Sequence, residues 1–168
     1  MITVVFGLPG SGKSFFAEKL SRRLEAVYIN SDRLRNSLGA RGMYTIEDKL
    51  VIYNAMADRV TQRLKEGKPV VVDATFYKQA MINIFLELAR THLVPINFIK
   101  VQANEALIKE RLSKPRKDSE ANYDVYLKIR EQFEEIKVPY LTLQSENDNV
   151  DEMLKVALVY IDTMHERK

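Results

Sequence analysis

The chain has 168 residues, of which 46% are hydrophobic and 29% are charged, with a formal net charge of +3 and no cysteine. This length and composition are typical of one globular domain spanning residues 1–168, and the lack of cysteine excludes disulfides, thiolate metal sites and cysteine nucleophiles. No apolar run is long enough to cross a membrane and no leader precedes the first predicted strand, so we expect a cytoplasmic protein without a membrane partner.

Short apolar segments alternate along the chain with longer segments of helical periodicity, which predicts an α/β fold with a parallel sheet flanked by helices. The predicted strands span residues 2–6, 26–29, 70–73, 96–101 and 140–143. The predicted helices are one that begins at residues 13–14, one that is capped within residues 30–32 and runs to residue 38, and those over residues 45–66, 78–91, 105–112, 122–136 and from 150 onward. Residues 39–42 predict a flexible loop.

The segment after the first predicted strand matches the phosphate-binding pattern G-x-x-x-x-G-K-[ST]. It consists of Gly7, Leu8, Pro9, Gly10, Ser11, Gly12, Lys13 and Ser14. The glycines let the backbone turn tightly and aim its N–H groups at phosphate oxygens. Lys13 can reach the β and γ phosphates, and the Ser14 hydroxyl can coordinate Mg²⁺ at the start of the following helix. The sequence therefore predicts binding of a nucleoside triphosphate.

Asp32 and Arg35 follow the second predicted strand, at the sheet edge where ligands of open α/β sheets bind. A spacing of three places both side chains on one face of a helix. The carboxylate could then orient or deprotonate an acceptor hydroxyl, while the guanidinium holds a phosphate. The alternative is that Asp32 or Ser31 is only a helix cap and that Arg33 and Arg35 form a solvated face.

Asp73 ends the apolar strand over residues 70–73. Acids in this place hold Mg²⁺ through water or hold the acceptor in proteins that transfer phosphoryl groups. Many ATPases have a second acid at the next position, where this chain has Ala74, which argues against simple hydrolysis. The alternative is an acid that caps the following turn.

A polar, basic stretch over residues 113–119 connects two predicted helices. We interpret residues 113–120 as a small lid, because an arginine on a mobile segment can stabilise the negative charge of a transferring phosphate while excluding water. Arg111 and Arg116 are the candidates. The alternative is a solvated turn.

Several of these segments together resemble the AAA-type P-loop kinase family, which includes the kinase domain of polynucleotide 5′-hydroxyl kinases and is related to zeta toxins. The resemblance is carried by residues 7–14, 30–35, Tyr44, 70–76, Arg111, 119–121, Tyr126 and 133–134. It implies a P-loop NTPase three-layer sandwich with strand order 2-3-1-4-5 and a small lid. It also implies ATP and Mg²⁺ as cosubstrates, and transfer of the γ-phosphate to a hydroxyl group.

By motif match, this resemblance assigns the nucleotide phosphates and the metal to Lys13 and Ser14, and the role of general base to Asp32. Arg35 would hold a phosphate near the acceptor hydroxyl, and Asp73 would help to position the acceptor.

The lid arginine implied by the resemblance is Arg116 when the spacing is counted from Lys114, and Arg111 when the helix end is matched. The chain departs from the family after residue 76, where many relatives have an arginine. Here the only cation in that stretch is Lys78, so the resemblance does not define how the acceptor is bound.

The leading interpretation is a kinase, a phosphotransferase with an alcohol acceptor, for which a polynucleotide 5′ end is the first candidate. Tyr44 and Tyr53 border the predicted acceptor pocket, where one of them could stack on a base or sugar. Two alternatives stay open: a small-metabolite kinase of the gluconate or shikimate type, and a non-catalytic nucleotide-dependent switch or binding module. Residues 147–149 lack the Asn-Lys-x-Asp signature expected of a GTPase.

Overall fold

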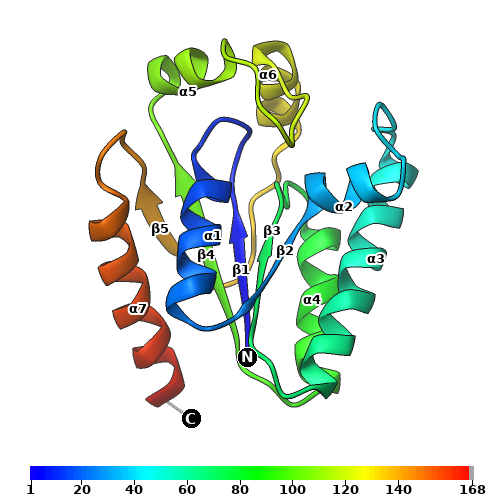
Figure 1. Ribbon diagram of the computed structural model, residues 1–168, viewed down its shortest axis with the longest axis vertical. Helices are drawn as coiled ribbons and strands as arrows, with labels where there is room; N and C mark the ends of the chain where they lie inside the picture. The colour runs from blue at the N-terminus through cyan, green and yellow to red at the C-terminus, as the bar shows by residue number, and fades with distance from the viewer. Residues whose placement is uncertain (167–168) are drawn as a thin grey trace.

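The computed structural model describes residues 1–166, whose strands form one parallel sheet (Figure 1). The strands are β1 (Ile2–Phe6), β2 (Val27–Asn30), β3 (Val70–Asp73), β4 (Ile96–Gln102) and β5 (Leu141–Gln144). Their order in the sheet is β2-β3-β1-β4-β5. This confirms the strand order that the resemblance implied.

The central strands are apolar because helices cover the sheet on both faces. Every residue of β1 and β3 is buried. In the parallel register Val5 of β1 pairs with Asp73 of β3, and Asp73 pairs with Asn30 of β2. The carboxyl ends of these three strands therefore lie at one edge of the sheet, beside the segment over residues 7–14.

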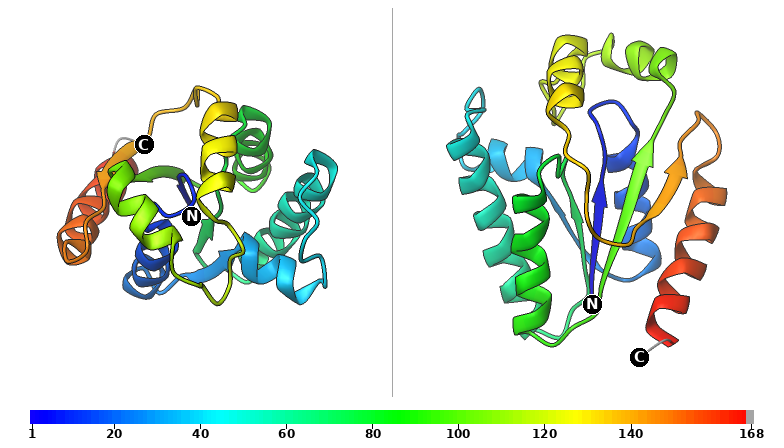
Figure 2. Two further views of the ribbon diagram at one scale, coloured as in Figure 1. Left: turned by 90° about the horizontal axis from the view of Figure 1, so that it is seen from above. Right: turned by 180° about the vertical axis from the view of Figure 1, so that it is seen from behind.

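The helices form two outer layers and a covering group above the sheet edge (Figures 1 and 2). They are α1 (Lys13–Arg23), α2 (Ser31–Ser37), α3 (Ile46–Lys65), α4 (Gln79–Thr91), α5 (Glu105–Leu112), α6 (Tyr123–Gln132) and α7 (Val150–Glu166). Helices α1 and α7 pack on one face of the sheet, and α3 and α4 on the other, each with its own apolar core. Helices α5 and α6 lie beyond the carboxyl ends of the strands. The predicted three-layer sandwich is confirmed.

Helix α2 is capped by Asn30, whose Oδ1 accepts a hydrogen bond of 2.9 Å from the Arg33 backbone N–H. The prediction that Asp32 or Ser31 could serve only as the cap is therefore wrong. Asn30 has the extended backbone that a cap needs, and its amide oxygen reaches the third residue of the helix. Asp32 lies in the first turn with its carboxylate available for other contacts.

Helix α6 is shorter than the predicted helix over residues 122–136. The chain leaves the helix at Phe133, whose backbone is extended (φ −70°, ψ 115°). The next backbone N–H, of Glu134, donates 2.9 Å to the Tyr77 carbonyl, and Ile136 packs into the core under α3 and α4. A contact with a distant segment thus overrides the local helical periodicity.

Within residues 1–166, the apolar stretches of the helices are too short or too interrupted by charge to traverse a lipid bilayer.

Candidate phosphate-transfer site

The loop over residues 7–14 joins β1 to α1 at the edge of the sheet. Gly12 has a left-handed backbone (φ 87°) and stands directly before the first residue of α1, which is Lys13. The first turn of α1 contains no acidic residue. The buried Ser11 Oγ has no hydrogen-bond partner within the described part of the chain. The positive end of the eleven-residue helix α1 thus faces the loop, where the Lys13 ammonium and the unpaired Ser11 hydroxyl also lie.

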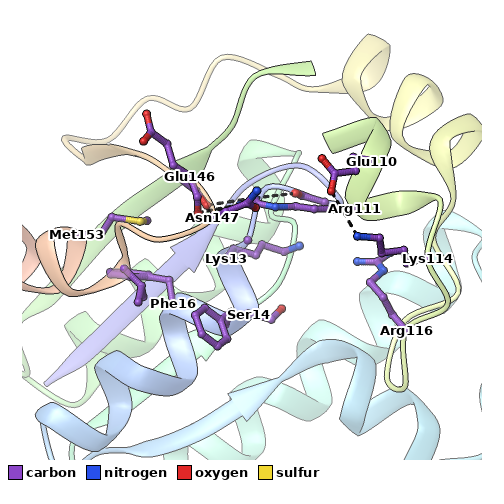
Figure 3. Close-up of a pocket in the computed structure, with 15 residues that line it drawn as sticks. Lys13, Ser14, Phe16, Glu110, Arg111, Lys114, Arg116, Glu146, Asn147 and Met153 are labelled. Atoms are coloured by element: carbon purple, nitrogen blue, oxygen red, sulfur yellow. Dashed lines mark hydrogen bonds and ion pairs between the residues drawn. The ribbon is translucent and has the colours of Figure 1, made fainter. Parts of the chain in front are cut away.

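A pocket of about 490 Å³ opens in front of this loop (Figure 3). It is lined by Gly10, Gly12, Lys13, Ser14, Phe15, Phe16, Glu110, Arg111, Lys114, Arg116, Ser145, Glu146, Asn147, Val150 and Met153. Its walls come from the loop and α1, from the end of α5 with the segment after it, and from the connection between β5 and α7. The structure therefore brings together the predicted phosphate loop and both candidate lid arginines.

Arg111 is fixed against the loop by three hydrogen bonds. Its Nη1 donates 3.3 Å to the Gly10 carbonyl and 3.1 Å to Ser145 Oγ, and its Nη2 donates 3.0 Å to the Glu146 carbonyl. Burial lowers the pKa of Arg111, and the nearby Glu110 partly opposes this. The guanidinium thus forms a fixed wall of the pocket between the loop and the end of β5.

Arg116 belongs to the predicted lid segment between α5 and α6, at the edge of the pocket (Figure 3). Its Nη2 donates 2.6 Å to the Ala121 carbonyl. Burial lowers the pKa of Arg116, and the charge of Asp32 acts in the opposite direction. Arg116 therefore borders the pocket and lies near enough to Asp32 for the charge of that carboxylate to act on it.

Asp32 and Arg35 form an ion pair on one face of α2, as the spacing predicted. Arg35 Nη1 lies 2.9 Å from Asp32 Oδ1, and the side chains are 7% and 31% exposed respectively. The Arg35 guanidinium stacks on the Tyr44 ring at 4.9 Å, and its Nε has no hydrogen-bond partner in residues 1–166. Neither residue lines the pocket itself.

Asp73 is fully buried at the end of β3. Its Oδ2 accepts hydrogen bonds of 2.6 Å from Tyr28 Oη and of 2.6 Å from Asn30 Nδ2. The Tyr28 hydroxyl also lies 3.4 Å from the Ser14 carbonyl. Burial raises the pKa of Tyr28, and the Asp73 charge raises it further. The hydrogen bonds of Asp73 are thus made with residues of β2. They do not support the alternative in which Asp73 caps the turn after β3.

The sequence reasoning missed Tyr28 and Asn30 as partners of Asp73. Both are alternate residues of β2 and so face the same side of the sheet. The alternation of polar residues in an otherwise apolar strand was the sequence signal that could have indicated these partners. It could not be assigned to Asp73 from the sequence, because that requires the pairing of β2 with β3.

The donor set fits a divalent cation completed by phosphate oxygens and water. The hydroxyl of exposed Ser14 lies at the start of α1, and Asp73 Oδ1 is buried without a hydrogen-bond partner among the described residues. Residues 1–166 contain no group of three or more His, Cys, Asp or Glu side chains that could hold a metal alone. Mg²⁺ characteristically takes few protein ligands and retains substrate phosphates and water, which is consistent with this arrangement.

The predicted lid segment contacts α2 and the loop after it. Arg33 bridges α1 and the lid through ion pairs with Glu18 (2.9 Å) and Asp118 (3.0 Å). Glu120 Oε2 accepts a hydrogen bond of 2.6 Å from Tyr44 Oη. The lid therefore covers the side of the site on which Asp32 lies.

Residues 2–136 match the family model AAA_33, described as an AAA domain. The chain belongs to this AAA-domain family. The predicted membership of an AAA-type P-loop family is thus confirmed in its coarser form, whereas the narrower resemblance to polynucleotide kinases and zeta toxins stays a prediction. No curated protein sequence matches the chain.

Solved structures of the same fold include a gluconokinase from Sinorhizobium meliloti 1021, with 22% identity and a TM-score of 0.75 over 98% of this chain and 93% of that chain. A sugar kinase from Janibacter sp. HTCC2649 has 18% identity and a TM-score of 0.74 over 96% and 94%. The APS kinase CysC of Mycobacterium tuberculosis, in complex with AMPPNP and APS, has 18% identity and a TM-score of 0.72 over 96% of each chain. At these identities the likeness establishes the P-loop NTPase fold of this family member.

Proposed function

We propose that this protein is an ATP-dependent kinase that transfers the γ-phosphate to a hydroxyl group of an acceptor. The observation that carries the proposal is the Asp32–Arg35 ion pair of α2, the helix that follows β2 at the same edge of the sheet as the phosphate loop. A carboxylate and a buried guanidinium in this position provide a base and an anion contact for an acceptor. A pure nucleotide switch requires neither.

The nucleotide phosphates bind to the loop over residues 7–14, with Lys13 as the mobile cation. The backbone N–H groups at the start of α1 complete the anion site. The nucleoside lies in the pocket between α1 and the connection from β5 to α7, against the fixed guanidinium of Arg111.

Ser14 Oγ and Asp73 are the protein groups that would hold Mg²⁺. When bound, this cation neutralises negative charge on the phosphates. Tyr28 and Asn30 orient the Asp73 carboxylate, because both donate hydrogen bonds to its Oδ2.

In the transfer step Asp32 accepts the proton of the acceptor hydroxyl. A bond forms between the acceptor oxygen and the γ-phosphorus while the bond from that phosphorus to the β,γ-bridging oxygen breaks, and ADP leaves. Arg116 stabilises the charge on the transferring group, and Arg35 orients Asp32 and holds a phosphate of the acceptor. Ala74 in place of a second acid is consistent with transfer rather than hydrolysis.

The two lid arginines should give different phenotypes. Arg116→Ala should lower kcat about 10²- to 10³-fold with little change in ATP affinity, because it removes a charge needed mainly in the transition state. Arg111→Ala should instead weaken ATP binding and lower the melting temperature, because three hydrogen bonds to the loop and to the segment after β5 are lost. Steady-state kinetics, ATP titration and thermal unfolding of both variants test this. The reverse pattern would exchange their roles.

A transfer assay with labelled ATP tests the proposed function. Acceptors should include oligonucleotides with 5′-hydroxyl ends, nucleosides, gluconate and other small alcohols. A labelled oligonucleotide whose formation depends steeply on salt would establish the polynucleotide acceptor. A labelled small product would favour the second candidate, a metabolite kinase, toward which the fold of the gluconokinase and sugar kinase points. Phosphate release with no labelled acceptor in any reaction would contradict the proposal.

A further inference from the structure

Lys49 is a half-buried cation of α3 that has a tyrosine rather than a carboxylate as its partner. Its Nζ donates 3.0 Å to Tyr77 Oη and lies 4.7 Å from the centre of the Tyr77 ring. The ion pairs formed within residues 1–166 do not include Lys49, whereas Lys78, whose Nζ also lies over the Tyr77 ring, pairs with Glu134 at 3.2 Å. The charge of Lys78 is thus compensated, and that of Lys49 is not.

The Tyr77 hydroxyl has a hydrogen to donate. An ammonium group only donates hydrogen bonds, so the Tyr77 oxygen is the acceptor in the contact with Lys49. Tyr77 is 2% exposed, and buried hydroxyls normally use their hydrogen as well. No acceptor for this hydrogen lies within the described part of the chain. Lys49 and Tyr77 together therefore offer donor hydrogens beyond the one that Lys49 gives to Tyr77 Oη.

The Lys49–Tyr77 pair and the Asp32–Arg35 pair have Tyr53 as a common neighbour. Tyr53 lies one turn after Lys49 on the same face of α3, and its hydroxyl accepts a hydrogen bond of 2.9 Å from the Phe76 N–H, next to Tyr77. Burial raises the pKa of Tyr53, the neighbouring Tyr77 raises it further, and the charge of Arg35 lowers it. The two groups of donors therefore border the same region between α2, α3 and the segment after β3.

Arg35 adds an unsatisfied donor to this region. Its side chain is more than nine-tenths buried, yet its Nε has no partner in residues 1–166. Asp32 occupies only Nη1. Burying cationic donors without acceptors is costly, so a ligand that supplies negatively charged oxygens is the natural complement.

We propose that Lys49 and Tyr77 form a second anion contact in the acceptor pocket, so that the preferred acceptor is an alcohol that carries a phosphate or carboxylate group. The inference rests on the proposed function and specifies its substrate class. A neutral alcohol would leave the Lys49 ammonium without an anionic partner and the Arg35 Nε without an acceptor, and would bind more weakly.

The test compares matched acceptors that differ by one anionic group. Thymidine 3′-monophosphate is paired with thymidine, and gluconate with the open-chain polyol sorbitol, in transfer assays and in titrations with ADP and Mg²⁺ present. The wild-type protein should prefer the charged member of at least one pair. Lys49→Ala should raise KM and the dissociation constant for that member about 10- to 100-fold, the effect of losing one charge-assisted hydrogen bond, with kcat and ATP affinity nearly unchanged. Lys49→Arg should restore part of the preference, and Tyr77→Phe should remove a smaller part.

Lys65→Ala is the matched control, because Lys65 is an exposed lysine at the end of the same helix. Equal loss of charged and neutral acceptors in Lys49→Ala would overturn the inference, as would the absence of any charge preference in the wild-type protein, including failure to bind all four compounds. The titrations separate the two proposals. Charge-dependent binding that requires Lys49, without phosphoryl transfer to any acceptor, supports the anion contact and contradicts the kinase.

Discussion

Asp32→Asn should reduce turnover about 10²- to 10⁴-fold and leave ATP affinity nearly unchanged, because the substitution removes the base but not the nucleotide site. Asparagine keeps an oxygen that can accept the hydrogen bond from Arg35 Nη1, so the buried guanidinium keeps a partner. The expected signature is a fall in kcat and in kcat/KM by the same factor. Single-turnover measurements with labelled ATP, together with calorimetric titration of ATP, test it.

Asp118→Asn is the matched control for this substitution. Asp118 is also a carboxylate in an ion pair with an arginine close to the site, and its side chain is 37% exposed, against 31% for Asp32. It should have only a small effect on turnover, because it lies on the lid and not beside the acceptor. A weakened ATP affinity in Asp32→Asn would instead assign Asp32 to the nucleotide or the metal. Equal turnover losses in the two variants would indicate a structural role.

The parts of the fold that the sequence predicted are those fixed by local pattern. The buried strands show as apolar β-branched runs, and the phosphate loop is one contiguous motif. The end of α6 could not be predicted in this way, since it depends on the contact of Glu134 with Tyr77, far away in the sequence. Local helical periodicity continues past the point where that contact turns the chain.

In the candidate site, too, the contacts between residues close in the sequence were predictable and those between distant residues were not. Asp32 and Arg35 were predictable because they lie three positions apart on one helix, so that their contact is local. The hydrogen bond of Tyr28 with Asp73 spans 45 residues, and the contact of Lys49 with Tyr77 spans 28. Contacts of this kind follow from strand order and helix packing, which single-sequence patterns do not specify. Sequence therefore identified the chemistry of the phosphates better than that of the acceptor.

Gly7→Ala should abolish nucleotide binding, the second large effect that we expect. Gly7 has a positive φ of 152°, and a Cβ atom there would lie 2.2 Å from the Val101 carbonyl oxygen. That oxygen belongs to the backbone of β4, which is held between β1 and β5 and cannot move aside. The loop must shift instead, and a displacement of about 1 Å at a binding site costs about 10²-fold. ATP affinity should fall by at least that factor.

The free energy of unfolding should fall too, by about 2–5 kcal/mol, the sum of left-handed strain and overpacking. Gly67→Ala provides the control, because Gly67 also has a positive φ (72°) but no atom within 4 Å of the added Cβ. It should lose only about 1–2 kcal/mol from backbone strain and bind ATP normally. Denaturant unfolding and ATP titration of both variants distinguish the destabilisation due to backbone strain from that due to the clash of the added Cβ. Normal ATP binding by a folded Gly7→Ala protein would mean that the loop does not hold the phosphates in the observed conformation.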